Sequence, residues 1–155
     1  MLWEVIQDKE VKILMKMKNG KSYSELITIP TFEERFKYLQ LKGSVGKDTF
    51  GHDRYLNQML YNSQEWKSIR NKIIIRDNGC DLACEGFEIH GQILIHHINP
   101  ISVEDIIDRS PKVFDPENLI TTVHNTHNAI HYSDASLLIT APIKRSKNDT
   151  CPWKR

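Results

Sequence analysis

Alternation of apolar and polar positions predicts a β-hairpin at the start of the chain. Two β-compatible runs, KEVKILMKMK and KSYSELITI, fill residues 9–29 and are separated by Asn19-Gly20. Asn-Gly is favoured in two-residue hairpin turns because both of its positions readily adopt a positive φ. We therefore expect residues 1–30 to form an N-terminal β-hairpin.

Helical periodicity replaces this alternation over residues 31–79. Thr31 and Glu34 have the spacing of a capping box, and an apolar stripe with helical spacing follows them up to Gly43. Residues 54–61 predict a second, short helix.

A third helix is expected to begin after Asn62, which precedes Glu65 by three residues and therefore has the position of an N-cap. Asn78-Gly79 is a pair that breaks helices, so we expect the helix to end there. The apolar face of this helix contains Trp66, Ile69 and Ile73.

The C-terminal half of the chain returns to β-type runs. Residues 87–98 predict a strand, with a turn at His90-Gly91 as one option. Residues 100–116 predict a long irregular connection, and residues 117–123 (ENLITTV) predict a second strand because they are rich in β-branched side chains. Residues 124–132 (HNTHNAIHY) predict a helix. Helices and strands in separate runs, in 155 residues, predict a single small domain of the α+β class.

The composition is that of a globular protein. The hydrophobic fraction of 39% predicts a folded chain and not a disordered one. No apolar run approaches the roughly 18 residues that a membrane span needs. Residues 1–20 lack the layout of a signal peptide, and an odd number of cysteines favours a reducing compartment. The net charge is only +1, but residues 135–155 form a basic tail. This tail fits a polyanionic partner or a solvated terminus equally well.

Histidines are the candidate chemistry of the chain, since five of the seven fall between residues 96 and 131. His127 and His131 are four positions apart, which places both imidazoles on one helix face, close enough to bind one ion. His124 is three positions before His127 and has the less favourable spacing. One further histidine from a strand would complete three protein ligands, the number that leaves a metal open to water or substrate.

The strand offers two adjacent candidates, His96 and His97, inside the run ILIHHINP. Successive strand residues point to opposite faces, so one ring is expected to bind the ion while its neighbour lies beside the site without binding it. A neutral imidazole can accept a proton from water, and a cation together with such a base is what phosphodiester hydrolysis requires. The alternative is that these histidines are ordinary hydrogen-bonded or surface residues.

The positions of His96-His97, Asn118 and His127 resemble the His-Asn-His motif of the HNH endonuclease family. The spacing from Asn118 to His127 and on to His131 is similar to that in the nuclease domains of DNase colicins. The chain also resembles a group of small bacteriophage and prophage HNH proteins over roughly residues 49–132. The segments that carry this likeness are TFGHDRYLNQMLYNSQEWKSIRNKIIIRDNGCDL, ILIHHINP and PENLITTVHNTHNAIHY.

The resemblance implies a ββα-metal finger (His-Me finger), which we expect over residues 80–134. It implies that His97 is the general base and that Asn118 orients it by holding the loop between the strands. It also implies one divalent metal ion, Mg²⁺, Mn²⁺, Ni²⁺ or Zn²⁺, and metal-dependent hydrolysis of a DNA phosphodiester by nicking or by double-strand cleavage. The ligands of this ion would be His96, His127 and His131.

The sequence departs from many HNH proteins at the structural zinc that two Cys-x-x-Cys pairs bind beside the finger. The first pair is Cys80-x-x-x-Cys84, one residue too wide, and Val123 and Thr126 stand in place of the second pair. Two thiolates make a poor zinc site, so we expect no structural zinc.

The resemblance also implies double-stranded DNA as partner, with the finger helix docked in the minor groove. Arg70, Lys72 and Arg76 lie on the third predicted helix and would contact phosphates, although a solvated helix face is the simpler explanation of such a pattern. Members of the phage group act with the large terminase subunit in the bacterial host cytoplasm, which suggests the same partner here. The rival hypothesis is a non-cleaving DNA-binding or terminase-adaptor protein that keeps the finger as a scaffold.

Overall fold

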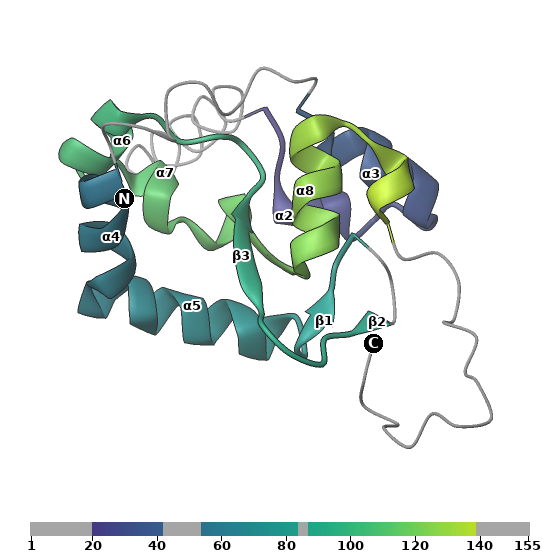
Figure 1. Cartoon of the computed structure of the whole chain (residues 1–155), viewed down its shortest axis with the longest axis horizontal. Helices are drawn as coiled ribbons and strands as arrows, with labels where there is room; N and C mark the ends of the chain where they lie inside the picture. Colours follow the sequence, from purple (N-terminus) through teal and green to yellow (C-terminus); the bar gives the residue numbers. More distant parts are fainter. Residues whose placement is uncertain (1–19, 42–53, 84–86, 139–155) are drawn as a thin grey trace, which may run out of the picture.

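Helices and two small antiparallel sheets alternate along residues 20–41, 54–83 and 87–138, the residues that the computed structural model describes (Figure 1). The arrangement confirms a small α+β domain. The first predicted strand of the hairpin and residues 139–155 of the basic tail lie outside the described residues. The elements are α2 (Tyr23–Leu26), α3 (Phe32–Leu39), α4 (Arg54–Asn62), α5 (Gln64–Arg76), β1 (Cys80–Asp81), β2 (Phe87–Glu88), β3 (Leu94–His97), α6 (Val103–Ile107), α7 (Pro111–Phe114), η1 (Pro116–Asn118), β4 (Leu119–Thr122), α8 (His124–Tyr132) and η2 (Ala135–Leu137).

The predicted second strand of the hairpin is wrong, because the run KSYSELITI contains the short helix α2. Ser22 is the N-cap, and its side chain accepts a hydrogen bond from the backbone N–H of Glu25. The turn of helix places Leu26 in the core, where it is fully buried. Capping by Ser22 and burial of one leucine therefore override the β-compatible composition of this segment.

The predicted N-cap of α3 is confirmed, and the predicted N-cap of α5 is wrong by one residue. Thr31 caps α3 as predicted, since its hydroxyl oxygen accepts a hydrogen bond from the backbone N–H of Glu34. The N-cap of α5 is Ser63 and not Asn62, and the Ser63 hydroxyl oxygen accepts from the N–H of Trp66 at 3.1 Å. Helix α5 ends before Asn78-Gly79, where both residues have a positive φ.

The predicted irregular connection of residues 100–116 contains two short helices, α6 and α7, and the prediction was wrong there. Ser102 and Asp105 form a capping box at the start of α6, and Pro111 occupies the first turn of α7, where its missing N–H has no cost.

Strands β3 and β4 pair in an antiparallel register that aligns His96 with Ile120 and His97 with Leu119. Successive residues of β4 point to opposite faces, so Ile120 joins one core cluster and Leu119 joins the other. The first cluster includes Ala129 of α8, and the second includes residues of α5. The sheet thus lies between α8 and α5, which occupy different sides of β3 in Figure 1.

Two buried aspartates connect the elements around this sheet. Asp77, at the end of α5, accepts hydrogen bonds from the backbone N–H and the hydroxyl of Thr121, at 2.9 and 3.1 Å. Asp81 accepts from the backbone N–H of Val123 at 2.9 Å, immediately before α8. These carboxylates fix β4 and the start of α8 relative to α5 and β1.

Replacement of Asp77 by Asn should lower the free energy of unfolding by roughly 2–3 kcal/mol. One carboxylate oxygen becomes an amide that faces a donor, and the charge paired with Arg76 is lost. Urea denaturation measures the loss, with Asp108→Asn on the exposed end of α6 as the matched control. Equal stability of the two variants would contradict this assignment.

Candidate metal centre

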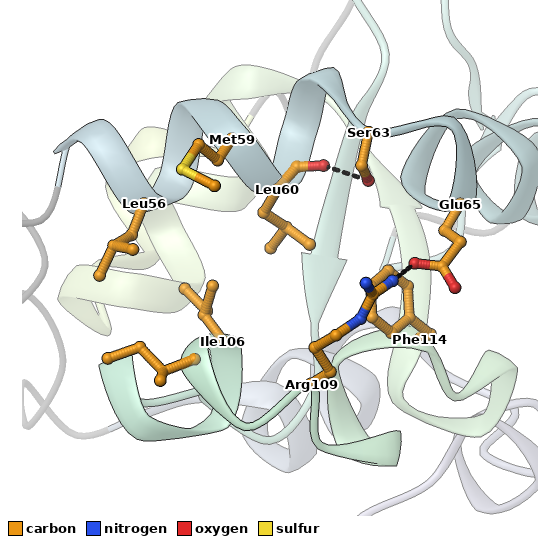
Figure 2. Close-up of a pocket in the computed structure, with 9 residues that line it drawn as sticks. Leu56, Met59, Leu60, Ser63, Glu65, Ile106, Arg109 and Phe114 are labelled. Atoms are coloured by element: carbon orange, nitrogen blue, oxygen red, sulfur yellow. Dashed lines mark hydrogen bonds and ion pairs between the residues drawn. The ribbon is translucent and has the colours of Figure 1, made fainter.

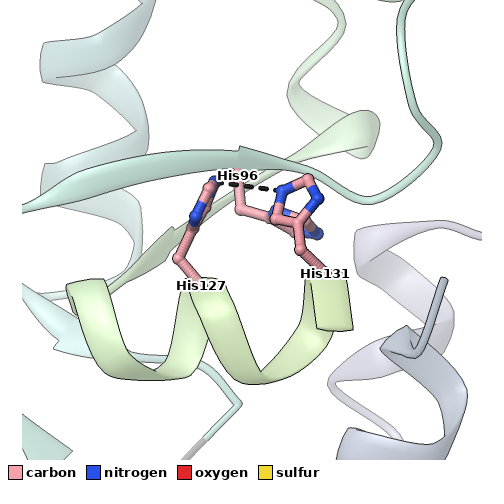
Figure 3. Close-up of side chains that lie close together, drawn as sticks. All are labelled: His96, His127 and His131. Atoms are coloured by element: carbon pink, nitrogen blue, oxygen red, sulfur yellow. Dashed lines mark hydrogen bonds between the residues drawn. The ribbon is translucent and has the colours of Figure 1, made fainter. Parts of the chain in front are cut away.

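Three histidines from two elements converge on one point between β3 and α8. His96 comes from β3, and His127 and His131 come from α8, with their rings turned toward one another (Figure 3). Each ring offers a nitrogen, and these nitrogens all lie within 4.8 Å of one another. The structure therefore brings together the three residues that the sequence analysis selected as ligands.

The convergence follows from local geometry. His127 and His131 are one turn apart, so their Nε2 atoms approach to 3.2 Å above the same helix face. His96 points to the face of the sheet that packs against α8, and its ring lies edge-on to both helix rings, with centroids 5.3 and 5.2 Å away. A buried strand face and an i, i+4 helix pair are sufficient to build the cluster.

Burial keeps these rings neutral. His96 is 1% exposed, and burial, together with repulsion by His127 and His131, lowers its pKa well below the usual range. Burial and the neighbouring His131 lower the pKa of His127 to about 4. Burial also lowers the pKa of His131. Neutral imidazoles are the form that binds metal ions, because each then has a lone pair to donate.

The residues present fit a divalent cation. The Nε2 atom of His96 is buried and has no hydrogen-bond partner, a condition that is costly unless a ligand satisfies the atom. Two nitrogens that bind one transition metal at about 2.1 Å lie roughly 3.0–3.4 Å apart for bond angles of about 90–109°. The 3.2 Å between the two helix nitrogens falls in this range. Three nitrogen ligands leave positions for water and substrate, and favour the later transition metals.

His97 lies on the other face of the strand and takes no part in the cluster. Its ring stacks on the indole of Trp66, with centroids 5.5 Å apart and an interplanar angle of 25°. Its Nε2 atom lies 3.0 Å from the carbonyl oxygen of Val113. A carbonyl only accepts, so Nε2 carries the proton and Nδ1 keeps the lone pair. Burial lowers the pKa of His97 to about 4, and the hydrogen bond to Val113 opposes this shift.

The side chain of Asn118, at the end of the segment that connects the strands, binds two other points of that segment. Its carboxamide oxygen accepts hydrogen bonds from the backbone N–H and the side chain of Asn99, at 2.7 and 2.8 Å. Its amide group donates to the carbonyl of Lys112 at 3.0 Å. Because Lys112 precedes Val113, the same contacts place the carbonyl that binds His97. These contacts are those that an orienting role of Asn118 would require. The role itself stays a prediction.

The basic residues of α5 differ in their freedom to bind phosphate. Arg76 donates to the carbonyl oxygens of Pro116 and Leu119, pairs with Asp77 and lies 3.5 Å over the ring of Tyr23. A phosphate would have to displace these partners, so this geometry does not support the predicted DNA contact of Arg76.

Arg70 and Lys72 have fewer constraints. Arg70 is partly buried and donates one hydrogen bond to the carbonyl of Ile93, whereas Lys72 is exposed. Their proposed phosphate contacts stay predictions, and of the two Lys72 has the more accessible side chain.

Two residues near the site were missed by the sequence analysis. Lys21 exchanges hydrogen bonds with Asn99, which is 78 positions away, and its charge contributes to the lowered pKa of His96. Trp66 was assigned to an apolar helix face, but nothing in the spacing indicated that it contacts His97. Both contacts depend on tertiary structure and have no local signal.

A cavity of about 380 Å³ lies between α4, α6 and α7, and its lining includes none of the candidate site residues His96, His97, Asn118, His127 and His131 (Figure 2). Its walls are mostly apolar, and the Arg109–Glu65 ion pair lies at one side. The histidines and Asn118 that the sequence analysis selected therefore lie outside the lining of this cavity.

The expectation of no structural zinc stays a prediction. Cys80 is free and partly buried, whereas Cys84 and Cys151 lie outside the described residues. In the described part of the chain, no helix has the length and apolar character that a membrane crossing requires.

Neither a scan against models of protein families nor searches of curated proteins and of solved structures give a match.

The variants His96→Ala, His127→Ala and His131→Ala each remove a direct ligand of the proposed site. Each should weaken Ni²⁺ binding by more than roughly 100-fold, because loss of a residue that only supports a ligand already costs roughly 10–100-fold. Calorimetric titration of the metal-free protein measures the affinity. His124→Ala is the matched control, since His124 is an exposed histidine on the same helix. Wild-type affinity in all three variants would show that the cluster is not a metal site.

Proposed function

We propose that the protein is a metal-dependent DNA endonuclease of the HNH type, in which β3, β4 and α8 form a ββα-metal finger. The observation that carries the proposal is the separation of two adjacent histidines. His96 joins His127 and His131, while His97 lies on the opposite face with Nδ1 unprotonated. A structural metal site would have no need of a second histidine held in one tautomer beside it.

His96, His127 and His131 would hold the divalent ion, which supplies positive charge against the negative charge that develops on the phosphate and the leaving oxygen. The Nδ1 atom of His97 would take the proton from the attacking water. The carbonyl of Val113 maintains the required tautomer and stabilises the imidazolium that forms. A bound phosphate anion would favour protonation of His97, and the nearby divalent ion would oppose it.

Asn118 supports this chemistry indirectly in the proposal. Its carboxamide fixes the chain at Asn99, two residues after His97, and at Lys112, which precedes the Val113 carbonyl. Both the base and its hydrogen-bond acceptor are thereby held by one buried side chain.

The substrate and biological setting in the proposal rest on the resemblance to phage and prophage HNH proteins. Double-stranded DNA would be the substrate, with Lys72 and Arg70 as candidate phosphate contacts. The large terminase subunit would be the partner, in the bacterial host cytoplasm. A nitrogen-rich ligand set is compatible with Mn²⁺, Ni²⁺ and Zn²⁺, and Mg²⁺ can replace them where it is more abundant.

The protein should nick or linearise supercoiled plasmid in the presence of Mg²⁺, Mn²⁺ or Ni²⁺ and should be inactive in excess chelator. His97→Ala should lower the cleavage rate by roughly 10²–10⁴-fold, the usual contribution of a general base, with Ni²⁺ affinity close to that of the wild type. Gel electrophoresis of the plasmid forms measures the rate, and His124→Ala again is the control.

Two outcomes would refute the assignment. Cleavage by His97→Ala at the wild-type rate would exclude His97 as the base. A wild-type protein that binds metal and DNA but cleaves with none of these ions would favour the non-cleaving DNA-binding or terminase-adaptor alternative.

A further inference from the structure

Trp66 contacts the candidate base from a different element. It lies in the first turn of α5 and is 4% exposed, and its indole plane is stacked on the imidazole of His97 at 5.5 Å and 25°. Tyr61, at the end of α4, packs against the indole, with ring centroids 5.2 Å apart. An aromatic pair from two helices thus supports one face of the His97 ring.

This contact restricts a motion that the hydrogen bond of His97 leaves open. Rotation about the Cβ–Cγ bond displaces Nδ1 more than Nε2, because Nε2 lies closer to the rotation axis than Nδ1 does. The hydrogen bond to Val113 therefore selects the tautomer but limits the motion of Nδ1 less than it limits the motion of Nε2. A plane stacked on the ring opposes the rotation directly.

We infer that Trp66 is a positioning residue that holds the Nδ1 atom of His97 in the direction of the reacting water. The inference rests on the proposed endonuclease function. Misplacement of a catalytic group by about 1 Å can cost roughly 100-fold in rate, so an effect on turnover is expected although Trp66 is buried and is not one of the three clustered histidines.

The buried cluster around Trp66 offers a matched control for the loss of stability that any truncation of a core residue causes. Ile73 lies on the same helix, belongs to the same buried cluster and is 1% exposed, and its aliphatic side chain has no plane that could stack on a ring. We therefore expect Ile73→Ala to lower stability through loss of core packing, without removing a ring stacked on His97.

Cleavage kinetics separate positioning from stability. Trp66→Leu and Trp66→Met keep an apolar side chain but lack an aromatic plane, whereas Trp66→Phe restores the plane. At a temperature where every variant is folded, Trp66→Leu and Trp66→Met should each lower kcat roughly tenfold or more, with KM within about twofold of the wild-type value. Trp66→Phe should have a kcat within about threefold of wild type. Ile73→Ala should leave kcat near the wild-type value.

The position of the ring has a readout that does not depend on activity. The ¹⁵N and ¹H side-chain resonances of His97 report its tautomer and the order of the ring. We expect one Nε2-protonated state in the wild type and in Trp66→Phe, and averaged signals in Trp66→Leu and Trp66→Met. His124 serves as the internal reference.

The outcomes distinguish the two proposals. The inference is overturned if Trp66→Leu and Trp66→Met have the kcat of Ile73→Ala and His97 signals like those of the wild type. Failure of the wild-type protein to cleave DNA with any of the metals would refute the endonuclease function. In that case, His97 signals that stay ordered without the indole would still reject Trp66 as a positioning residue.

Discussion

The pleat of β3 is the constraint on which the candidate site depends. Consecutive side chains on a strand point to opposite faces, and the register with β4 determines which face each one takes. His96 therefore reaches α8, where His127 and His131 stand one turn apart, and His97 reaches the opposite side and Trp66. A register shift of one residue would exchange the two rings. The separation of His96 from His97 is thus a consequence of strand pairing.

Local periodicity is enough to predict much of this arrangement. The four-residue spacing of His127 and His131 defines one helix face, and the observed helix α8 covers the predicted residues 124–132. Strand alternation requires that His96 and His97 point apart. The spacing does not determine whether His96 or His97 points toward α8. That choice came from the resemblance to HNH proteins. The α+β class also follows from the order of β-type and helical runs.

The sequence is least informative where distant partners decide the structure. Residues 21–29 have β-compatible composition, but the core accepts Leu26 from a capped turn of helix. The position of Arg76 on α5 is typical of a cation that faces solvent. Its guanidinium, however, donates to backbone carbonyls that are 40 and 43 positions away. Residues 100–116 have no long apolar period, and short capped helices form there. Contacts of this kind arise only when the chain is folded, so no local pattern reports them.

The position of a bound metal tests the assignment of the four histidines most directly. Crystals grown with Mn²⁺ or Ni²⁺, measured at the absorption edge of the metal, locate the ion by anomalous diffraction. We expect one strong peak within about 2.0–2.3 Å of nitrogens of His96, His127 and His131, with the ring of His97 outside the coordination sphere. A peak bound by His97, or no peak among the three clustered histidines, would contradict this division of metal ligand and base.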